Sequence, residues 1–251
     1  MTNRQIEIKS PAEVQKMRKS GALLAQVFAE LAKNVAPGIT TGELDTIARG
    51  LIEGGGAKPA FLGYRGFPAT LCTSVNDEIV HGIPGPRVLN EGDIVAVDCG
   101  LILEGFYADR AYTFPIGKVP EDVERLLAVT EESLNRAIAQ VVAGNRLGAV
   151  SSAVQQYVVK QGFSIVENYT GHGIGRSMHE LPEVPNFGNP NTGPKLKPGL
   201  VIAIEPMVNI GTHRNYTLDD GWTVVTEDGA MSAHFEHTVA VTENGPLVLT
   251  A

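Results

Sequence analysis

The sequence predicts an α+β protein built from two similar halves, each with two helices followed by strands. Helical and strand-like patterns occur twice in the same order along the 251 residues. Segments 89–98 and 196–205 also align at an offset of 107 residues, and both end in an acid, Asp98 and Glu205. We therefore expect the halves, roughly 11–114 and 120–242, to pack about a pseudo-twofold axis within a single domain, 1–251.

The first half begins with two predicted helices. Ser10-Pro11-Ala12-Glu13 has the pattern of a capping box with proline at the first helical position, which predicts a helix from Pro11 to about Val35. A shorter helix is expected after Thr41, ending at the glycine run 54–56. Strand-like residues then extend from 61 to 114.

A hairpin is predicted around Leu103-Glu104-Gly105, where a turn pattern separates two strands. Folding the chain about residues 103 and 104 places Asp98 directly opposite Asp109. Two facing carboxylates repel each other unless they share a proton or bind a metal ion. We favour a metal over a solvated hairpin face, because Asp98 ends a nearly continuous apolar strand.

The second half repeats this order, with helices expected at 121–142 and 147–161. Glu205 then ends an apolar strand, as Asp98 does in the first half. A further hairpin is expected to join 222–226 to 232–238. Alternation along its second strand places His234, Glu236 and Thr238 on one face.

Histidines accompany these acids. His172 lies in Gly171-His172-Gly173-Ile174-Gly175, a loop whose spacing matches neither common nucleotide-binding glycine motif. A second internal match, at an offset of 98, aligns His81-Gly82-Ile83-Pro84 with His179-Glu180-Leu181-Pro182. Each half therefore supplies an acid at a strand end and a histidine, which predicts a shared site between the halves.

Composition restricts the class of protein. The formal charge of −8 argues against nucleic acid or an anionic membrane as the partner. The two cysteines form no C-x-x-C pair, so neither a zinc ribbon nor a disulfide framework is expected. The first seven residues lack the apolar segment of a secretory leader, and no apolar run approaches the length of a membrane span. We expect a cytoplasmic protein.

With these motifs in place, the chain resembles the type I methionine aminopeptidases, which have the pita-bread fold. This fold places duplicated helix-helix-strand halves around a central curved antiparallel sheet. The resemblance extends from the first helix to Thr242, and only 33 positions separate His172 from Glu205, too few for the insertion of type II enzymes. The segments that carry it are Tyr64, Cys72-Thr73-Ser74-Val75-Asn76, the His81 motif, Asp98, Asp109, the His172 loop, His179-Glu180, Glu205-Pro206-Met207, Asp220-Gly221-Trp222-Thr223 and 232–238.

The resemblance implies a metal-dependent methionyl aminopeptidase with two divalent ions, the metal being left open among Co, Mn, Fe and Zn. Asp98 and Asp109 would bind the first ion. His172, Glu205 and Asp109 would bind the second, and Glu236 would bridge both ions alongside Asp109. Hydroxide activated by the two metals would then attack the first peptide bond.

The resemblance also implies roles in binding the substrate. His179 would hold the scissile carbonyl oxygen, His81 would lie near the next amide, and Glu205 would relay a proton. The expected substrates are the N-termini of nascent polypeptides whose second residue is small. A monomer that contacts the ribosome transiently and no membrane is expected. The apolar pocket for methionine would be lined by Tyr64, Phe67, Cys72, Met178 and Trp222.

Two alternatives remain open at this point. An Xaa-Pro peptidase shares the five-ligand set, but normally carries a large additional N-terminal domain and further histidines. A non-catalytic binding module on the same fold would have lost metal ligands, whereas all five are present here.

Overall fold

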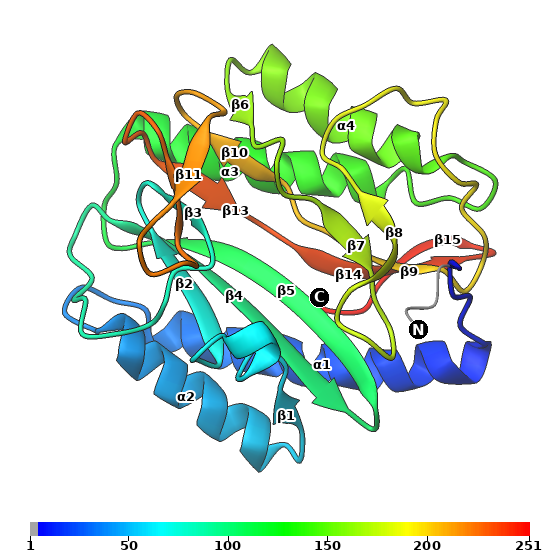
Figure 1. Ribbon diagram of the computed structural model, residues 1–251, viewed down its shortest axis with the longest axis horizontal. Helices are drawn as coiled ribbons and strands as arrows, with labels where there is room; N and C mark the ends of the chain where they lie inside the picture. Colours follow the sequence, from blue (N-terminus) through cyan, green and yellow to red (C-terminus); the bar gives the residue numbers. More distant parts are fainter. Residues whose placement is uncertain (1–4) are drawn as a thin grey trace.

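A computed structural model describes residues 5–251 of the chain. Two helical layers enclose the strands (Figure 1). On one side lie α1 (Pro11–Asn34) and α2 (Thr41–Gly54), and on the other lie α3 (Glu121–Ile138) and α4 (Leu147–Lys160). This arrangement confirms the α+β class and the order of helices. None of the helices in residues 5–251 has the length and apolar character required to cross a membrane.

The helix boundaries follow from local chemistry. Ser10 and Thr40 each form a complete capping box at the start of α1 and α2. The third helix was predicted to continue to residue 142, but it ends at Ile138. Its last turn tightens, because the N–H groups of Gln140 and Val141 donate to carbonyls three residues back instead of four.

The strands form four antiparallel sheets within the described residues. In the first half, β4 (Ile94–Leu103) pairs with β1 (Lys58–Pro59), β2 (Leu71–Val75) and β5 (Phe106–Pro115). A five-stranded sheet has the order β15 (Gly245–Val248), β14 (His237–Thr242), β9 (Val201–Ile204), β7 (Gly171–Gly173) and β8 (Glu180–Val184). Two three-stranded sheets complete the set: β13 (Ser232–His234), β10 (Met207–Asn209) and β6 (Ser164–Ile165); and β11 (Asn215–Thr217), β12 (Val224–Thr226) and β3 (Glu78–Val80).

The β4–β5 hairpin turns one residue later than predicted. Glu104 and Gly105, with φ values of 50° and 81°, form the turn, and Leu103 pairs with Phe106. A two-residue hairpin turn of this kind requires positive φ at both central residues, and Gly105 adopts it without steric cost. Asp98 therefore lies opposite Ala111 instead of opposite Asp109. The two acids are diagonal neighbours on the same face of the hairpin.

Two further strand predictions were wrong. The segment 222–226 does not form a hairpin with 232–238: β12 pairs with β11 and β3, whereas β13 pairs with β10. Turn residues at 227–229 reverse the chain, but the two strands then join different sheets. Residues 61–70 are also not a strand, and include a short 3-10 turn, Tyr64–Gly66.

The backbone repeats itself between the two halves. Before α2, the Gly38 N–H donates to the Leu89 carbonyl and the Leu89 N–H donates to the Ile39 carbonyl. Before α4, Gly144, Leu196 and Asn145 repeat this pair of hydrogen bonds. Strand registers repeat as well, because Ala96 lies between Ser74 and Thr113 as Ala203 lies between His172 and Thr238. These matches support the proposal that the chain is one duplicated domain.

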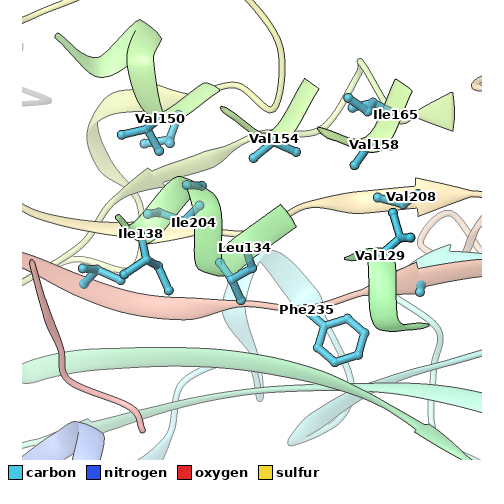
Figure 2. Packing of buried hydrophobic residues seen from close by; sticks show 14 of the residues in the cluster. Val129, Leu134, Ile138, Val150, Val154, Val158, Ile165, Ile204, Val208 and Phe235 are labelled. Carbon is cyan, nitrogen blue, oxygen red and sulfur yellow. The ribbon is translucent and has the colours of Figure 1, made fainter. Parts of the chain in front are cut away.

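Each helical layer packs on its own apolar core. Figure 2 shows α3 and α4 packed against strand residues of the second half, including Ile204 and Val208. A separate cluster joins α1 and α2 to β2 and β4. Tyr112 of β5 packs against both clusters and so connects the two cores.

Gly21, on the buried face of α1, should not tolerate a side chain. A Cβ there would lie 2.0 Å from the Leu249 carbonyl oxygen. Gly21→Ala should therefore lower the free energy of unfolding by about 1–3 kcal/mol, although alanine favours helices by about 1 kcal/mol. Gly50→Ala is the control, because its Cβ would have no neighbour within 4 Å. It should raise stability by about 0.5–1 kcal/mol. Denaturant unfolding that ranks the two variants in the opposite order would contradict this packing.

Candidate active site

The structure brings the five predicted metal ligands to one cavity between the halves. Asp98 and Asp109 come from the β4–β5 hairpin, His172 from β7, and Glu205 from the residue after β9. Glu236 lies between β13 and β14. Ligand atoms of Asp109, His172 and Glu236 all lie within 4.8 Å of one another.

His172 is oriented toward the acids by its backbone contact. Its Nδ1 lies 2.9 Å from the Gly173 carbonyl oxygen, which leaves Nε2 free to face the cavity. Nε2 lies 3.8 Å from Asp109 Oδ2 and 3.7 Å from Glu205 Oε1. Burial lowers the pKa of His172, so the imidazole is neutral, as a metal ligand must be.

The four acids occupy an environment that opposes their charged forms. Burial raises the pKa of Asp98 to about 7, and raises those of Asp109, Glu205 and Glu236 well above the usual range. Their mutual repulsion acts in the same direction: Glu236 raises the pKa of Asp109, and Glu205 raises that of Glu236. Cations bound among these groups would relieve both effects.

Unpaired oxygens test whether metal ions fit. In the described part of the chain, Asp98 Oδ1, Asp109 Oδ1 and Glu236 Oε1 are buried without a hydrogen-bond partner. Buried polar atoms are normally satisfied, so such a group is explained best by a ligand. Carboxylate oxygens together with one imidazole nitrogen form a donor set suited to first-row divalent metals. The residues therefore fit a metal centre.

The two predicted substrate histidines lie on the wall of the same cavity. His179 is at its exposed rim, with Nδ1 2.8 Å from the Tyr64 hydroxyl and its ring centroid 4.3 Å from that of His172. Desolvation, followed by the His172 ring, lowers the pKa of His179 well below its usual range. His81 has a left-handed backbone with φ of 62° and packs edge-on against Tyr169. Both imidazoles are neutral at pH 7.

An apolar pocket adjoins the ligands. The predicted lining residues Tyr64, Phe67, Cys72, Met178 and Trp222 all line the cavity and belong to one packed cluster. Phe67 and Trp222 meet edge to face, with ring centroids 5.1 Å apart. The Asp220 carboxylate holds the Trp222 loop by accepting hydrogen bonds from the N–H groups of Trp222 and Thr223.

Three residues outside the predicted set also contribute. Phe61 and Arg65 line the cavity. His234 is buried, and its Nε2 lies 3.9 Å from Glu205 Oε2. Alternation of side chains along 232–238 had placed His234 on the same face as Glu236, and this pattern indicated that His234 would lie near the predicted ligands. Phe61 and Arg65 lie in an irregular segment without alternation, and only the family resemblance, from which both residues depart, linked them to the pocket.

Comparison with known proteins shows the family to which the chain belongs. The model of metallopeptidase family M24 matches residues 15–243. A methionine aminopeptidase from Clostridium perfringens is 53% identical over 245 residues, or 98% of each chain. Methionine aminopeptidase 1 from Bacillus subtilis is 51% identical over 242 residues, covering 96% of this chain and 98% of the relative.

Solved structures show the same relationship. The methionine aminopeptidase of Rickettsia prowazekii superposes with a TM-score of 0.97 at 39% identity, covering 98% of this chain and 100% of the other. The prolidase of Pyrococcus horikoshii reaches a TM-score of 0.79 at 21% identity over 97% of this chain and 63% of its own, so that likeness concerns the fold alone. The chain belongs to the M24 metallopeptidases of pita-bread fold and, within that family, to the methionine aminopeptidases.

Proposed function

We propose that this aminopeptidase removes methionine from the N-termini of newly made proteins with a small second residue, using two divalent metal ions. The observation that carries the proposal is the coincidence of three features in one cavity: the five predicted metal ligands, two neutral histidines and an apolar pocket. The first would hold the metals, the second the substrate backbone, and the third the methionine side chain.

The metal ligands divide into two overlapping sets. Asp98 and Asp109 would hold one ion, His172, Glu205 and Asp109 the other, with Asp109 and Glu236 shared between them. Two divalent ions at such a site, drawn from Co, Mn, Fe or Zn, lower the pKa of a water molecule and stabilise negative charge on the substrate. Four carboxylates would balance the four positive charges, and the free amino group of the substrate would be recognised beside them.

Proton movement would fall to Glu205. Its carboxylate lies among the other ligands, and only this acid is also within 4 Å of a second histidine, His234. A carboxyl group with a raised pKa can accept a proton from water and return it to the departing amine near neutral pH. Asn186 restrains Glu205 by donating from Nδ2 to its backbone oxygen.

Tyr64 would set the tautomer of His179. A neutral imidazole carries one proton, and donation from the Tyr64 hydroxyl to Nδ1 places that proton on Nε2. The Nε2–H would then donate to the scissile carbonyl oxygen and stabilise its developing charge. His81, which also lines the cavity, would orient the next peptide unit.

The surroundings in the cell are also part of the proposal. Two free, buried thiols, Cys72 and Cys99, suit a reducing cytoplasm. We infer a monomer that meets its substrates as they leave the ribosome, through transient contact.

The shared ligands should control metal loading. Chelation should abolish activity, and added divalent metal should restore it.

Asp109→Asn and Glu236→Gln should reduce metal content and turnover more than Asp98→Asn, because each removes a charge shared by both ions. The same two variants should raise the melting temperature of metal-free protein, since a neutral amide relieves the buried repulsion. Metal analysis, turnover and calorimetry measure these effects. Full turnover without metal, or a greater loss from Asp98→Asn, would contradict the assignment.

His179 should affect chemistry without affecting metal. His179→Ala should lower kcat by roughly 10²–10³-fold, the scale for one lost oxyanion donor, at unchanged metal content. Tyr64→Phe keeps the ring but removes the hydroxyl that sets the tautomer, so it should cause a smaller loss of kcat. Loss of metal from the His179 variant would instead identify it as a ligand.

The second substrate residue should be selected by size. Met-Gly, Met-Ala, Met-Ser and Met-Thr peptides should be cleaved well, and Met-Leu and Met-Lys poorly. A substrate fixed at both its amine and its carbonyl directs the next side chain toward the wall that holds His81 and the Tyr64 loop. A displacement of about 1 Å of the carbonyl costs on the order of 100-fold in rate. Values of kcat/KM for Met-X peptides test this, with Leu-Pro and Ala-Pro as controls. Equal rates across X, or faster cleavage of Leu-Pro than of Met-Ala, would refute it.

A further inference from the structure

Two threonine hydroxyls join the halves of the molecule beside the metal ligands. The Thr238 hydroxyl accepts from the Asp109 N–H at 3.0 Å and donates to the Asp109 carbonyl at 2.8 Å. The Thr113 hydroxyl makes the same pair of bonds to His234, at 2.9 and 2.7 Å. Between them, the Glu236 N–H donates to the Ala111 carbonyl at 2.9 Å.

These contacts obey the internal symmetry of the chain. Thr113 lies opposite Ala96 in one half, and Thr238 lies opposite Ala203 in the other. The residues that they hold are also counterparts, because Asp109 is four residues before Thr113, and His234 is four residues before Thr238. The two hydroxyls thus occupy equivalent positions on either side of the Ala111–Glu236 contact.

The Thr238 hydroxyl supplies hydrogen bonds to Asp109 that the Thr238 backbone cannot supply. The N–H and C=O of Thr238 are already engaged by the C-terminal segment: the N–H donates to Thr250 Oγ1, and the carbonyl accepts from Leu249 N–H. Asp109 would therefore face Thr238 without a backbone partner. One hydroxyl has a single donor and two acceptor positions, which satisfies both groups of Asp109 at once. Thr238 and Thr113 are almost completely buried, so no solvent replaces these bonds.

We propose that Thr238 and Thr113 are positioning residues for the metal centre. Asp109 and Glu236, which would be shared by both ions, come from opposite sides of this junction. Their separation is therefore set by the distance between β5 and the 232–238 segment. The two hydroxyls fix that distance and the backbone orientation of Asp109, and so set the spacing of the ions. This inference rests on the proposed two-metal function.

Removal of one hydroxyl should alter metal binding specifically. Thr238→Val keeps the shape of the side chain but leaves the N–H and C=O of Asp109 unpaired. Binding of Mn²⁺, measured by calorimetry, should weaken by roughly 10–100-fold, the usual effect of losing a group that orients a ligand. The electron paramagnetic resonance spectrum of the Mn²⁺-loaded protein should change, because it responds to the distance between the two ions. Thr238→Ser should restore both properties.

Thr41→Val is the matched control. The Thr41 hydroxyl makes the same two bonds to a single residue, accepting from Gly85 N–H at 2.9 Å and donating to its carbonyl at 3.1 Å, away from the metal ligands. This variant should lose stability but keep the Mn²⁺ affinity and the spectrum. An equal loss of affinity in Thr41→Val, or an unchanged spectrum in Thr238→Val, would overturn the proposal.

A second variant covers the case in which Thr238→Val does not fold. Thr113→Val should then weaken Mn²⁺ binding by about 10-fold and change the spectrum, with rescue by Thr113→Ser. Unfolding of both valine variants would assign the hydroxyls to stability alone and overturn the inference. Failure of the parent protein to bind two Mn²⁺ ions would instead refute the proposed function. If the parent protein binds two Mn²⁺ ions, and the threonine variants have the same Mn²⁺ affinity and spectrum as the parent, only this inference is refuted.

Discussion

The crowding of four carboxyl groups in one buried cavity is the constraint on which the rest of the structure depends. Burial and mutual repulsion both raise their pKa values, so the metal-free protein carries a local destabilising interaction at its centre. The acids come from strands that also belong to separate apolar cores. Those cores hold the four carboxyl groups together against their repulsion, so the proposed cation site would be formed without bound metal.

In the proposed function, recognition of the substrate and the chemistry would share residues in this cavity. Tyr64 contributes its ring to the apolar pocket and its hydroxyl to His179. Displacement of the Tyr64 ring by a poorly fitting side chain would therefore also disturb the proton on His179. In this way, the fit of methionine in the pocket would be transmitted to the group that stabilises the scissile carbonyl.

Local patterns predicted the helices, and the family resemblance supplied the set of metal ligands, but neither predicted which distant strands pair. The capping boxes at Ser10 and Thr40 specify where α1 and α2 begin, because all the necessary groups lie within four residues. The turn residues at 227–229 were read correctly as a reversal, but the partners of β12 and β13 are set by long-range packing. The observed register of the β4–β5 hairpin differed from the predicted one because the geometry of the turn depends on the φ angle of Glu104. Asp98 and Asp109 still lie on one face of the hairpin. The pairing partner of Asp98 moved by two residues, from Asp109 to Ala111, and a shift of two residues leaves side chains on the same face.

The repeated strand registers place chemically different residues at equivalent positions of the two halves. By position, Ser74 is the counterpart of His172, and Ala111 is the counterpart of Glu236. Asp109 corresponds in the same way to His234. A symmetric pair of identical subunits could not change one of these residues without changing its mate. In one duplicated chain, as proposed here, that restriction would be absent, so an imidazole on one side and an extra carboxylate on the other could arise separately. A covalent link between the halves would thus allow two chemically unequal sites to share one pseudo-twofold axis.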